Sequence, residues 1–205
     1  MEHFAAQLIA FIKANPDWTM AVIGITAFGE SFALVSLLFP GTAILIASGG
    51  LISAGAIPLF STAVAGIIGA VFGDAISFWL GQKFGPLLPG IWPFRRNPEM
   101  LRHGTEFFSR YGGGSVFIGR FFGPLRAVIP VAAGMMRMPA PLFYVANILS
   151  AIVWAPALII SGELIERSLM ISGHSETAML IIPAAGVIAA VIIYWARRHF
   201  APVRK

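Results

Sequence analysis

Apolar side chains dominate this chain in long runs that short polar stretches separate. Residues 4–13 carry them at helical spacing, which predicts a short interfacial helix that ends before Pro16. Nearly every residue from 18 to about 56 is apolar. Because one transmembrane helix needs only about 20 residues, the chain must turn within this run. Further apolar runs follow at 58–82, 112–136, 140–162 and 177–196.

Prolines and glycines interrupt two of these runs. The first contains Pro40-Gly41-Thr42, and we expect a span followed by a broken, returning segment hinged near Pro40 and Gly41. The run at 112–136 is interrupted by Gly119, Gly123, Pro124 and Pro130. Proline removes a backbone N–H and clashes with the preceding helical turn, so a straight transmembrane helix is not expected there. Both runs therefore predict re-entrant hairpins.

The polar part of the chain lies at residues 83–111. It carries five basic and two acidic side chains, and it predicts an irregular stretch followed by an amphipathic surface helix over 99–110. Basic loops beside transmembrane helices are cytoplasmic, and the C-terminal tail is basic as well. Three apolar runs lie between these two regions. If all three crossed the membrane, the tail would lie on the opposite side from the loop. One of them must therefore turn back, and 112–136 is the natural choice. The net negative stretch 163–176 is expected to be an outer loop.

The sequence contains a weak internal repeat. Gly49-Gly50-Leu51, Pro58-Leu59-Phe60 and Gly81 are matched by Ala133-Gly134-Met135, Pro141-Leu142-Phe143 and Gly162. We therefore predict an all-α membrane protein with an inverted repeat of two re-entrant helical hairpins, each followed by transmembrane helices. The expected segments are an N-terminal interfacial helix at 1–17, a first half at 18–82, a cytoplasmic basic linker with an amphipathic helix at 83–111, a second half at 112–167, and a final transmembrane helix with a basic tail at 168–205.

The composition agrees with an integral membrane protein and excludes other classes. Hydrophobic residues make up 58% of the 205 and charged residues 11%, with a mean hydropathy of +0.83. The net charge of +5 does not indicate nucleic acid binding, because the basic residues lie in loops and at the C-terminus rather than in one solvated patch. The chain has no cysteine, and its four histidines lie near loops or termini, so we expect no metal site and no cofactor.

Two arginines lie within the broken apolar run, where a charge costs at least a few kcal/mol. Arg120 and Arg126 are surrounded by apolar, aromatic, glycine and proline residues. A broken helix at membrane depth is tolerated only where it is buried in protein or lines a wet cavity. This favours a re-entrant loop that presents both guanidinium groups to an anion. The alternative is a helix at the cytoplasmic edge whose arginines reach the lipid headgroups.

Two carboxylates lie within the other apolar runs. Glu30 is the single charge of the first run, and its alternative interpretation is an interface carboxylate near a helix end. Asp74 follows Gly66, Gly69 and Gly73, whose spacing predicts a face that allows helices to approach closely. An arginine is the obvious partner for Asp74, either in a functional site or in a purely structural ion pair.

The segment from Phe117 to Met138 also resembles a known family. Its Gly119-Arg120-Phe121, Pro124-Leu125-Arg126, Pro130, Ala133-Gly134 and Met136-Arg137-Met138 are similar to the DedA family, whose shared region is also called the VTT or SNARE-associated domain. Glu30, Pro40-Gly41, and Gly69 to Asp74 look like the first hairpin and following span of that family. The resemblance covers roughly residues 25–165. The acidic residue that is frequent at the hairpin tip is here Thr42, so an acidic role at that position is in doubt.

This resemblance implies a protein of the bacterial inner (cytoplasmic) membrane that translocates polyprenyl phosphate carriers, chiefly undecaprenyl phosphate, with a suggested dependence on the proton gradient. The C-terminus is expected to be cytoplasmic because the tail is basic. More distant relatives scramble phospholipids. The membrane-embedded Glu, Asp and two Arg of the family carry over to Glu30, Asp74, Arg120 and Arg126. Arg120 and Arg126 are then expected to bind the phosphate, and Glu30 and Asp74 to pair with them and couple transport to protons.

Residues and resemblance together favour a transporter of a lipid phosphate. The alternative is a proton-coupled antiporter of small ions or cationic drugs, which needs the same acids but no pair of anion-binding arginines. An enzyme is not expected, because a lipid phosphatase needs a cluster of nucleophile and general acid that the sequence lacks. A scaffold without transport would leave the buried charges unexplained. The expected partners are the lipid substrate and the bilayer. The sequence does not decide whether the protein forms a homo-oligomer.

Overall fold

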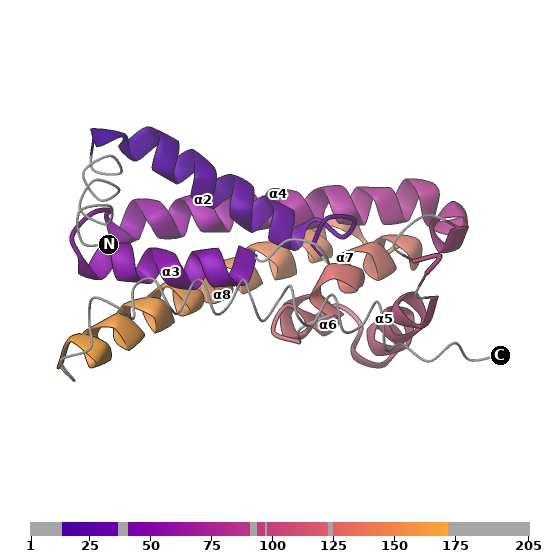
Figure 1. Ribbon diagram of the computed structural model, residues 1–205. Helices are drawn as coiled ribbons and strands as arrows, with labels where there is room; N and C mark the ends of the chain where they lie inside the picture. Colours follow the sequence, from indigo (N-terminus) through magenta and orange to yellow (C-terminus); the bar gives the residue numbers. More distant parts are fainter. Residues whose placement is uncertain (1–13, 37–40, 91–93, 97, 123–124, 172–205) are drawn as a thin grey trace.

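The chain folds as an assembly of helices (Figure 1). The computed structural model describes residues 14–36, 41–90, 94–96, 98–122 and 125–171, and every regular element within these ranges is helical. The predicted all-α class is thereby confirmed. The interfacial helix expected within 1–17 and the final transmembrane helix and tail expected within 168–205 fall almost entirely outside these residues. The helices are α2 (Pro16–Ser31), α3 (Gly41–Ser53), α4 (Leu59–Phe84), η1 (Gly85–Gly90), α5 (Pro98–Tyr111), α6 (Gly114–Gly119), α7 (Leu125–Met135) and α8 (Ala140–Ile171).

Two long helices, α4 and α8, run along the molecule (Figure 1). Leu59–Gly90, which is α4 with η1, and Ala140–Ser168 are long and apolar enough to cross a bilayer. α3 and α7 are apolar but only 13 and 11 residues long. At about 1.5 Å per residue, neither reaches across a hydrocarbon core of about 30 Å. α2 and α3 lie towards one end of the long pair, and α5, α6 and α7 lie towards the other (Figure 1).

The outer faces of the long helices are apolar. Phe60 and Phe72 of α4 are 79% and 60% exposed, and Leu164 of α8 is 59% exposed. A continuous apolar surface of this kind is unfavourable in water and suits contact with lipid. Many large apolar residues of the helices therefore face outward.

Small residues allow α2 and α8 to approach α4 closely. A Cβ atom at Gly69 would overlap the carbonyl oxygen of Gly24 in α2, and one at Gly73 would overlap the Phe28 carbonyl oxygen. Gly66 faces the methyl group of Ala155 in α8, which a Cβ atom at Gly66 would approach to 3.3 Å. The predicted close-packing face of α4 is thus confirmed, and it places the neighbouring Asp74 in the interior.

Two further glycine contacts connect the halves of the chain crosswise. Gly49 of α3 packs against the backbone of α8 at Gly162, and Gly134 of α7 packs against the backbone of α4 at Gly81. At each of these four positions a Cβ atom would overlap backbone atoms of the opposite helix. Each short helix therefore lies closest to the long helix of the other half of the chain.

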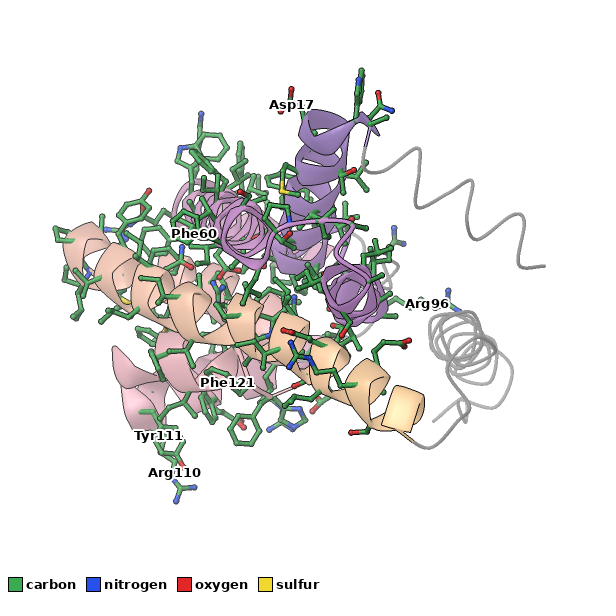
Figure 2. All side chains as sticks on the ribbon, turned by 90° about the vertical axis from the view of Figure 1, so that its left-hand side faces the viewer. Asp17, Phe60, Arg96, Arg110, Tyr111 and Phe121 are labelled. Carbon is green, nitrogen blue, oxygen red and sulfur yellow. The ribbon has the colours of Figure 1, made fainter. Side chains whose placement is uncertain are left out.

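α5 carries the polar surface that the sequence predicts over 99–110. Leu101 and Gly104 form its buried side against α7, while Arg102 on the exposed side pairs with Glu99 and Glu106. The hydrogen bond from Arg102 lowers the pKa of the Glu99 carboxyl. Arg110, near the end of the helix, points away from the other helices (Figure 2).

Three local features differ from the sequence predictions. Pro130 lies inside α7 rather than breaking it. It is the sixth residue of the helix, so the missing N–H removes only one hydrogen bond, that to the Arg126 carbonyl. α8 continues to Ile171 although a loop is predicted at 163–176, and Glu163 and Arg167 form an ion pair of 2.6 Å one turn apart on its surface. The stretch after α4 begins with the short helix η1 instead of irregular chain.

Candidate functional site

The break between α6 and α7 presents both arginines of the apolar run at 112–136. Arg120 directly follows α6, which ends at Gly119, and Arg126 is the second residue of α7. The first part of the intervening turn is held by backbone hydrogen bonds from Phe121 to the Ile118 carbonyl and from Phe122 to the Gly119 carbonyl. Both side chains extend to partners on other helices, because the turn itself offers them no carboxylate.

Arg120 forms an ion pair with Asp74 of α4. Its Nη2 donates to Asp74 Oδ2 and also to Oδ1 of Asn147 in α8, the latter at 2.5 Å. Arg120 is 6% exposed and Asp74 is 5% exposed, so the pair is shielded from solvent. The other terminal nitrogen of Arg120, Nη1, is buried and has no hydrogen-bond partner. Since buried polar groups are nearly always satisfied, this donor marks a place for an acceptor.

Arg126 forms a second ion pair, with Glu30 at the end of α2. Its Nη1 lies 3.1 Å from Glu30 Oε1, and its Nη2 donates to the Glu30 main-chain oxygen at 3.0 Å. The Glu30 carboxylate also accepts hydrogen bonds from the backbone N–H of Thr42, at 2.9 Å, and from the Thr42 hydroxyl. Glu30 therefore connects the end of α2, the start of α3 and the start of α7.

An aromatic ring of α8 lies beside both guanidinium groups. The Cζ atom of Arg126 is 4.4 Å from the centroid of Trp154, and that of Arg120 is 5.8 Å from the same ring. Both distances are within the range of cation–π attraction. The two ion pairs thus belong to one cluster, which combines side chains from α2, α4, α7, α8 and the turn after α6.

The cluster contains two positive and two negative charges in a buried setting. Removing one partner of such a pair typically costs about 3–5 kcal/mol, because the other charge is left unpaired. The same arrangement allows exchange, since an incoming anion can replace a carboxylate beside an arginine without leaving that arginine unpaired. Arg120, with a free donor, can accept an anion even before Asp74 leaves.

The structure brings together the four residues that the sequence singles out, Arg120, Arg126, Glu30 and Asp74. Their roles in binding phosphate and in coupling to protons stay predictions. Sequence reasoning missed Asn147 and Trp154, although an asparagine within an apolar run and a tryptophan seven residues later on the same helical face were visible signals. It noted Thr42 only as a departure from the family pattern. Within the described parts of the chain, no three His, Cys, Asp or Glu side chains gather as a metal site requires.

Comparison with known proteins identifies the family. Residues 39–164 match the VTT domain, a region that includes Thr42, Asp74, both arginines, Asn147 and Trp154. The chain belongs to this family. It is a membrane protein of the DedA family, in agreement with the resemblance read from the arginine motif.

Several relatives in the DedA family are similar over most of the chain. It is 36% identical over 160 residues to inner membrane protein YabI of Escherichia coli (strain K12), covering 78% of this chain and 63% of YabI. Over 195 residues it is 25% identical to protein DedA of the same strain, covering 93% and 88% of the two chains. An uncharacterized membrane protein of Mycobacterium tuberculosis (strain ATCC 25618 / H37Rv) is 31% identical over 184 residues, covering 84% and 80%. No solved structure matches the chain.

Proposed function

We propose that this DedA-family protein translocates a lipid phosphate, either a polyprenyl phosphate carrier such as undecaprenyl phosphate or a related phospholipid, with coupling to protons. The observation that carries the proposal is the buried Nη1 of Arg120, a charged donor without a partner beside a second buried arginine. Forked guanidinium groups suit phosphate oxygens, because they donate two parallel hydrogen bonds. A phosphate monoester carries two negative charges, and each arginine can pair with one of them.

The carboxylates supply a route to proton coupling. In the observed state Asp74 and Glu30 occupy Arg120 and Arg126 and compete with a phosphate. Protonation of either carboxylate weakens its pair and makes one guanidinium available to the substrate. Proton uptake and lipid binding then favour the same state of the protein, which is the thermodynamic requirement for coupling.

The arrangement of helices supports an inverted repeat with two re-entrant hairpins. The α2–α3 pair precedes the long helix α4, and the α6–α7 pair precedes the long helix α8. The reciprocal contacts, Gly49 with Gly162 and Gly134 with Gly81, relate the two halves as a pseudo-two-fold axis would. The charged cluster then lies where the two hairpins meet. In this arrangement the phosphate passes through the cluster while the prenyl or acyl tail stays in lipid.

The location follows from relatives and charge. One relative is named an inner membrane protein, and we propose the bacterial inner membrane for this chain as well. The basic residues between α4 and α6 favour a cytoplasmic position for α5, and the basic C-terminal residues favour the same side for the tail. We propose no enzymatic activity, because the described cluster holds no histidine, cysteine or lysine beside the arginines, and both of its carboxylates are paired with them.

Lipid binding by the purified protein tests the proposal. Native mass spectrometry in detergent should detect undecaprenyl phosphate on the wild type, with phosphatidylglycerol as competitor. The variant to compare is Arg120→Gln with Asp74→Asn, which removes both charges of one pair and leaves no buried carboxylate unpaired. Arg167→Gln, at an exposed ion pair of α8, is the matched control.

The two candidate functions predict different results. Binding that is selective for the phosphate monoester, lost in the double variant and kept in Arg167→Gln, supports the lipid-phosphate transporter. Equal binding of both lipids by all three proteins would contradict it. The proton-coupled antiporter of cations would then be the better explanation of Glu30 and Asp74.

A further inference from the structure

Two uncharged side chains of α8 contact the arginines in addition to the carboxylates. Asn147 and Trp154 are seven residues apart, which places them on one face of the helix two turns from each other. Asn147 is fully buried and Trp154 is 5% exposed. Neither carries a charge, so neither competes with an anion for the guanidinium groups.

The orientation of the Asn147 amide is fixed by its two hydrogen bonds. Nδ2 donates to the main-chain oxygen of Val71 in α4 at 3.1 Å, which leaves Oδ1 to accept from Nη2 of Arg120. An amide turned the other way would place its NH₂ group against the guanidinium and lose both bonds. Asn147 thus links α8, α4 and Arg120, and it holds Nη2 while Nη1 stays without a partner.

Trp154 supports the arginines through its ring face. The Arg126 guanidinium lies 4.4 Å from the ring centroid, and the Arg120 guanidinium lies at 5.8 Å. A tryptophan face attracts a cation more strongly than the other aromatic rings do, and more so in a desolvated site. This contact does not depend on the protonation state of Glu30 or Asp74.

We infer that Asn147 and Trp154 are positioning residues that keep the Arg120 and Arg126 guanidinium groups in place when the carboxylates release them. This inference rests on the proposed function, because release requires an anion that replaces Asp74 and Glu30. An arginine freed from its carboxylate at this depth has few other partners and would turn away from the substrate. Throughout the exchange Arg120 keeps its hydrogen bond to the Asn147 amide oxygen, and Arg126 keeps the ring face besides its hydrogen bond to the Glu30 main-chain oxygen.

The first test converts Asn147 into a competitor that can be switched by pH. In Asn147→Asp, the ionised carboxylate adds a second negative charge on Arg120, besides Asp74 of α4, and opposes a phosphate. When protonated, the new carboxyl again has one donor for Val71 and one acceptor for Arg120, as the amide has. The remaining charges of the cluster, Arg126 of α7 and Glu30 of α2, are the same in both proteins.

Binding of undecaprenyl phosphate in detergent is then measured from acid to alkaline pH for the wild type, Asn147→Asp and Asn147→Leu. We expect Asn147→Asp to bind at least about tenfold more weakly than the wild type at alkaline pH, a change of about 1.4 kcal/mol. The ratio of the lipid affinities of Asn147→Asp and the wild type should return towards one at acid pH. Asn147→Leu has no acceptor for Arg120 at any pH, so it should bind the lipid about tenfold more weakly than the wild type at every pH.

The second test uses the ring and does not depend on the folding of the Asn147 variants. Trp154→Leu removes the cation–π contact, and Trp154→Phe keeps a weaker one. We expect lipid binding about tenfold weaker in Trp154→Leu and of intermediate strength in Trp154→Phe. Trp79→Phe is the control, because Trp79 is 48% exposed on α4 and contacts Lys83 rather than the cluster.

The results separate this inference from the proposed function. A pH-dependent ratio for Asn147→Asp together with partial rescue by Trp154→Phe supports the positioning role. If wild type binds the phosphate lipid but Asn147→Asp differs from it by the same factor at every pH, and Trp154→Phe equals Trp154→Leu, the two residues are structural and the inference is wrong. If the wild type itself does not bind the lipid, the proposed function fails and the inference fails with it.

Discussion

Arg126 holds Glu30 at two points, its side-chain Oε1 at 3.1 Å and its main-chain oxygen at 3.0 Å. One arm of the guanidinium therefore contacts the carboxylate while the other fixes the end of α2. A phosphate can replace the first contact without disturbing the second. This division of tasks between Nη1 and Nη2 requires the fork of an arginine, which no other side chain provides.

Arg126→Lys should weaken binding of undecaprenyl phosphate by about tenfold or more. Lysine keeps the positive charge, but its single nitrogen cannot serve the Glu30 carboxylate and the Glu30 main-chain oxygen together, and a point charge binds phosphate without the paired geometry. The affinity is measured by titration in detergent, alongside the thermal midpoint of the unliganded protein. Arg167→Lys, at the exposed pair with Glu163, should behave as the wild type in both measurements. Unaltered affinity in Arg126→Lys would exclude bidentate binding at this arginine.

Glu30→Gln should bind the phosphate lipid at least as tightly as the wild type at neutral pH and should lose the part of the pH dependence of transport that Glu30 contributes. Under the proposed coupling, protonation of Glu30 weakens its ion pair with Arg126 and favours lipid binding. A glutamine takes up no proton, so the variant keeps only the pH dependence that comes from Asp74. Counterflow of labelled lipid in proteoliposomes at several pH values provides the measurement.

The Glu30→Gln experiment has a control variant and a result that would contradict the prediction. Glu163→Gln changes a carboxylate at the surface ion pair of α8 and should leave the pH dependence as it is. A Glu30→Gln protein that transports with the normal pH dependence would make Glu30 a structural link between α2 and α3, with its hydrogen bonds to Thr42 as the function that remains.

Gly162→Ala should destabilise the protein by about 1–3 kcal/mol, although alanine is the better helix former by about 1 kcal/mol. The added Cβ atom would overlap the carbonyl oxygen of Ile46 and force α3 away from α8. Gly114→Ala is the control, since no atom lies within 4 Å of the new methyl group. Thermal midpoints in the same detergent should fall for the first variant and stay within a few degrees of the wild type for the second.

Arg137→Gly should raise the stability by about 1 kcal/mol. Arg137 lies just after α7, which ends at Met135, in the left-handed region with a φ of 54°, and its N–H donates to the Gly134 carbonyl. Glycine adopts this conformation without the steric cost that a side chain carries. Arg110→Gly, in the last turn of α5, should lower the stability instead. The expected sign is tested by chemical or thermal unfolding, and a decrease for Arg137→Gly would assign the arginine side chain a stabilising contact of its own.

Much of this structure could be predicted because lipid restricts the choice of elements. Apolar runs of transmembrane length indicate helices directly, and α4 begins within one residue of the predicted run at 58–82. The charges were equally informative, since a charge at membrane depth requires a partner, and Glu30, Asp74, Arg120 and Arg126 were the only charges in the runs that form α2, α4, α6 and α7. Gly69 and Gly73 marked the close-packing side of α4 by their spacing alone.

The remaining features depend on contacts between residues far apart in the sequence. The sequence did not indicate which carboxylate pairs with which arginine, because that is decided by the packing of α7 between α4 and the end of α2. Asn147 and Trp154 were visible in the run 140–162, but the sequence did not show that they face the arginines. Pro130 was misread as a break, since a proline near the start of a short helix removes only one bond. The residues after Glu163 were misread as a loop although they continue α8.

The crosswise glycine contacts also determine when the first half of the chain can reach its final packing. α3 is covered by α8, and the hydrogen bond from Ser53 to the Glu163 carbonyl joins residues 110 positions apart. During synthesis, α3 therefore enters the bilayer long before the helix that covers it has been made. α4 must likewise wait for α7 before Gly81 is covered. Neither half can complete its folding alone, and two fragments separated between η1 and α5 would reach the native packing only when both are present in the same membrane.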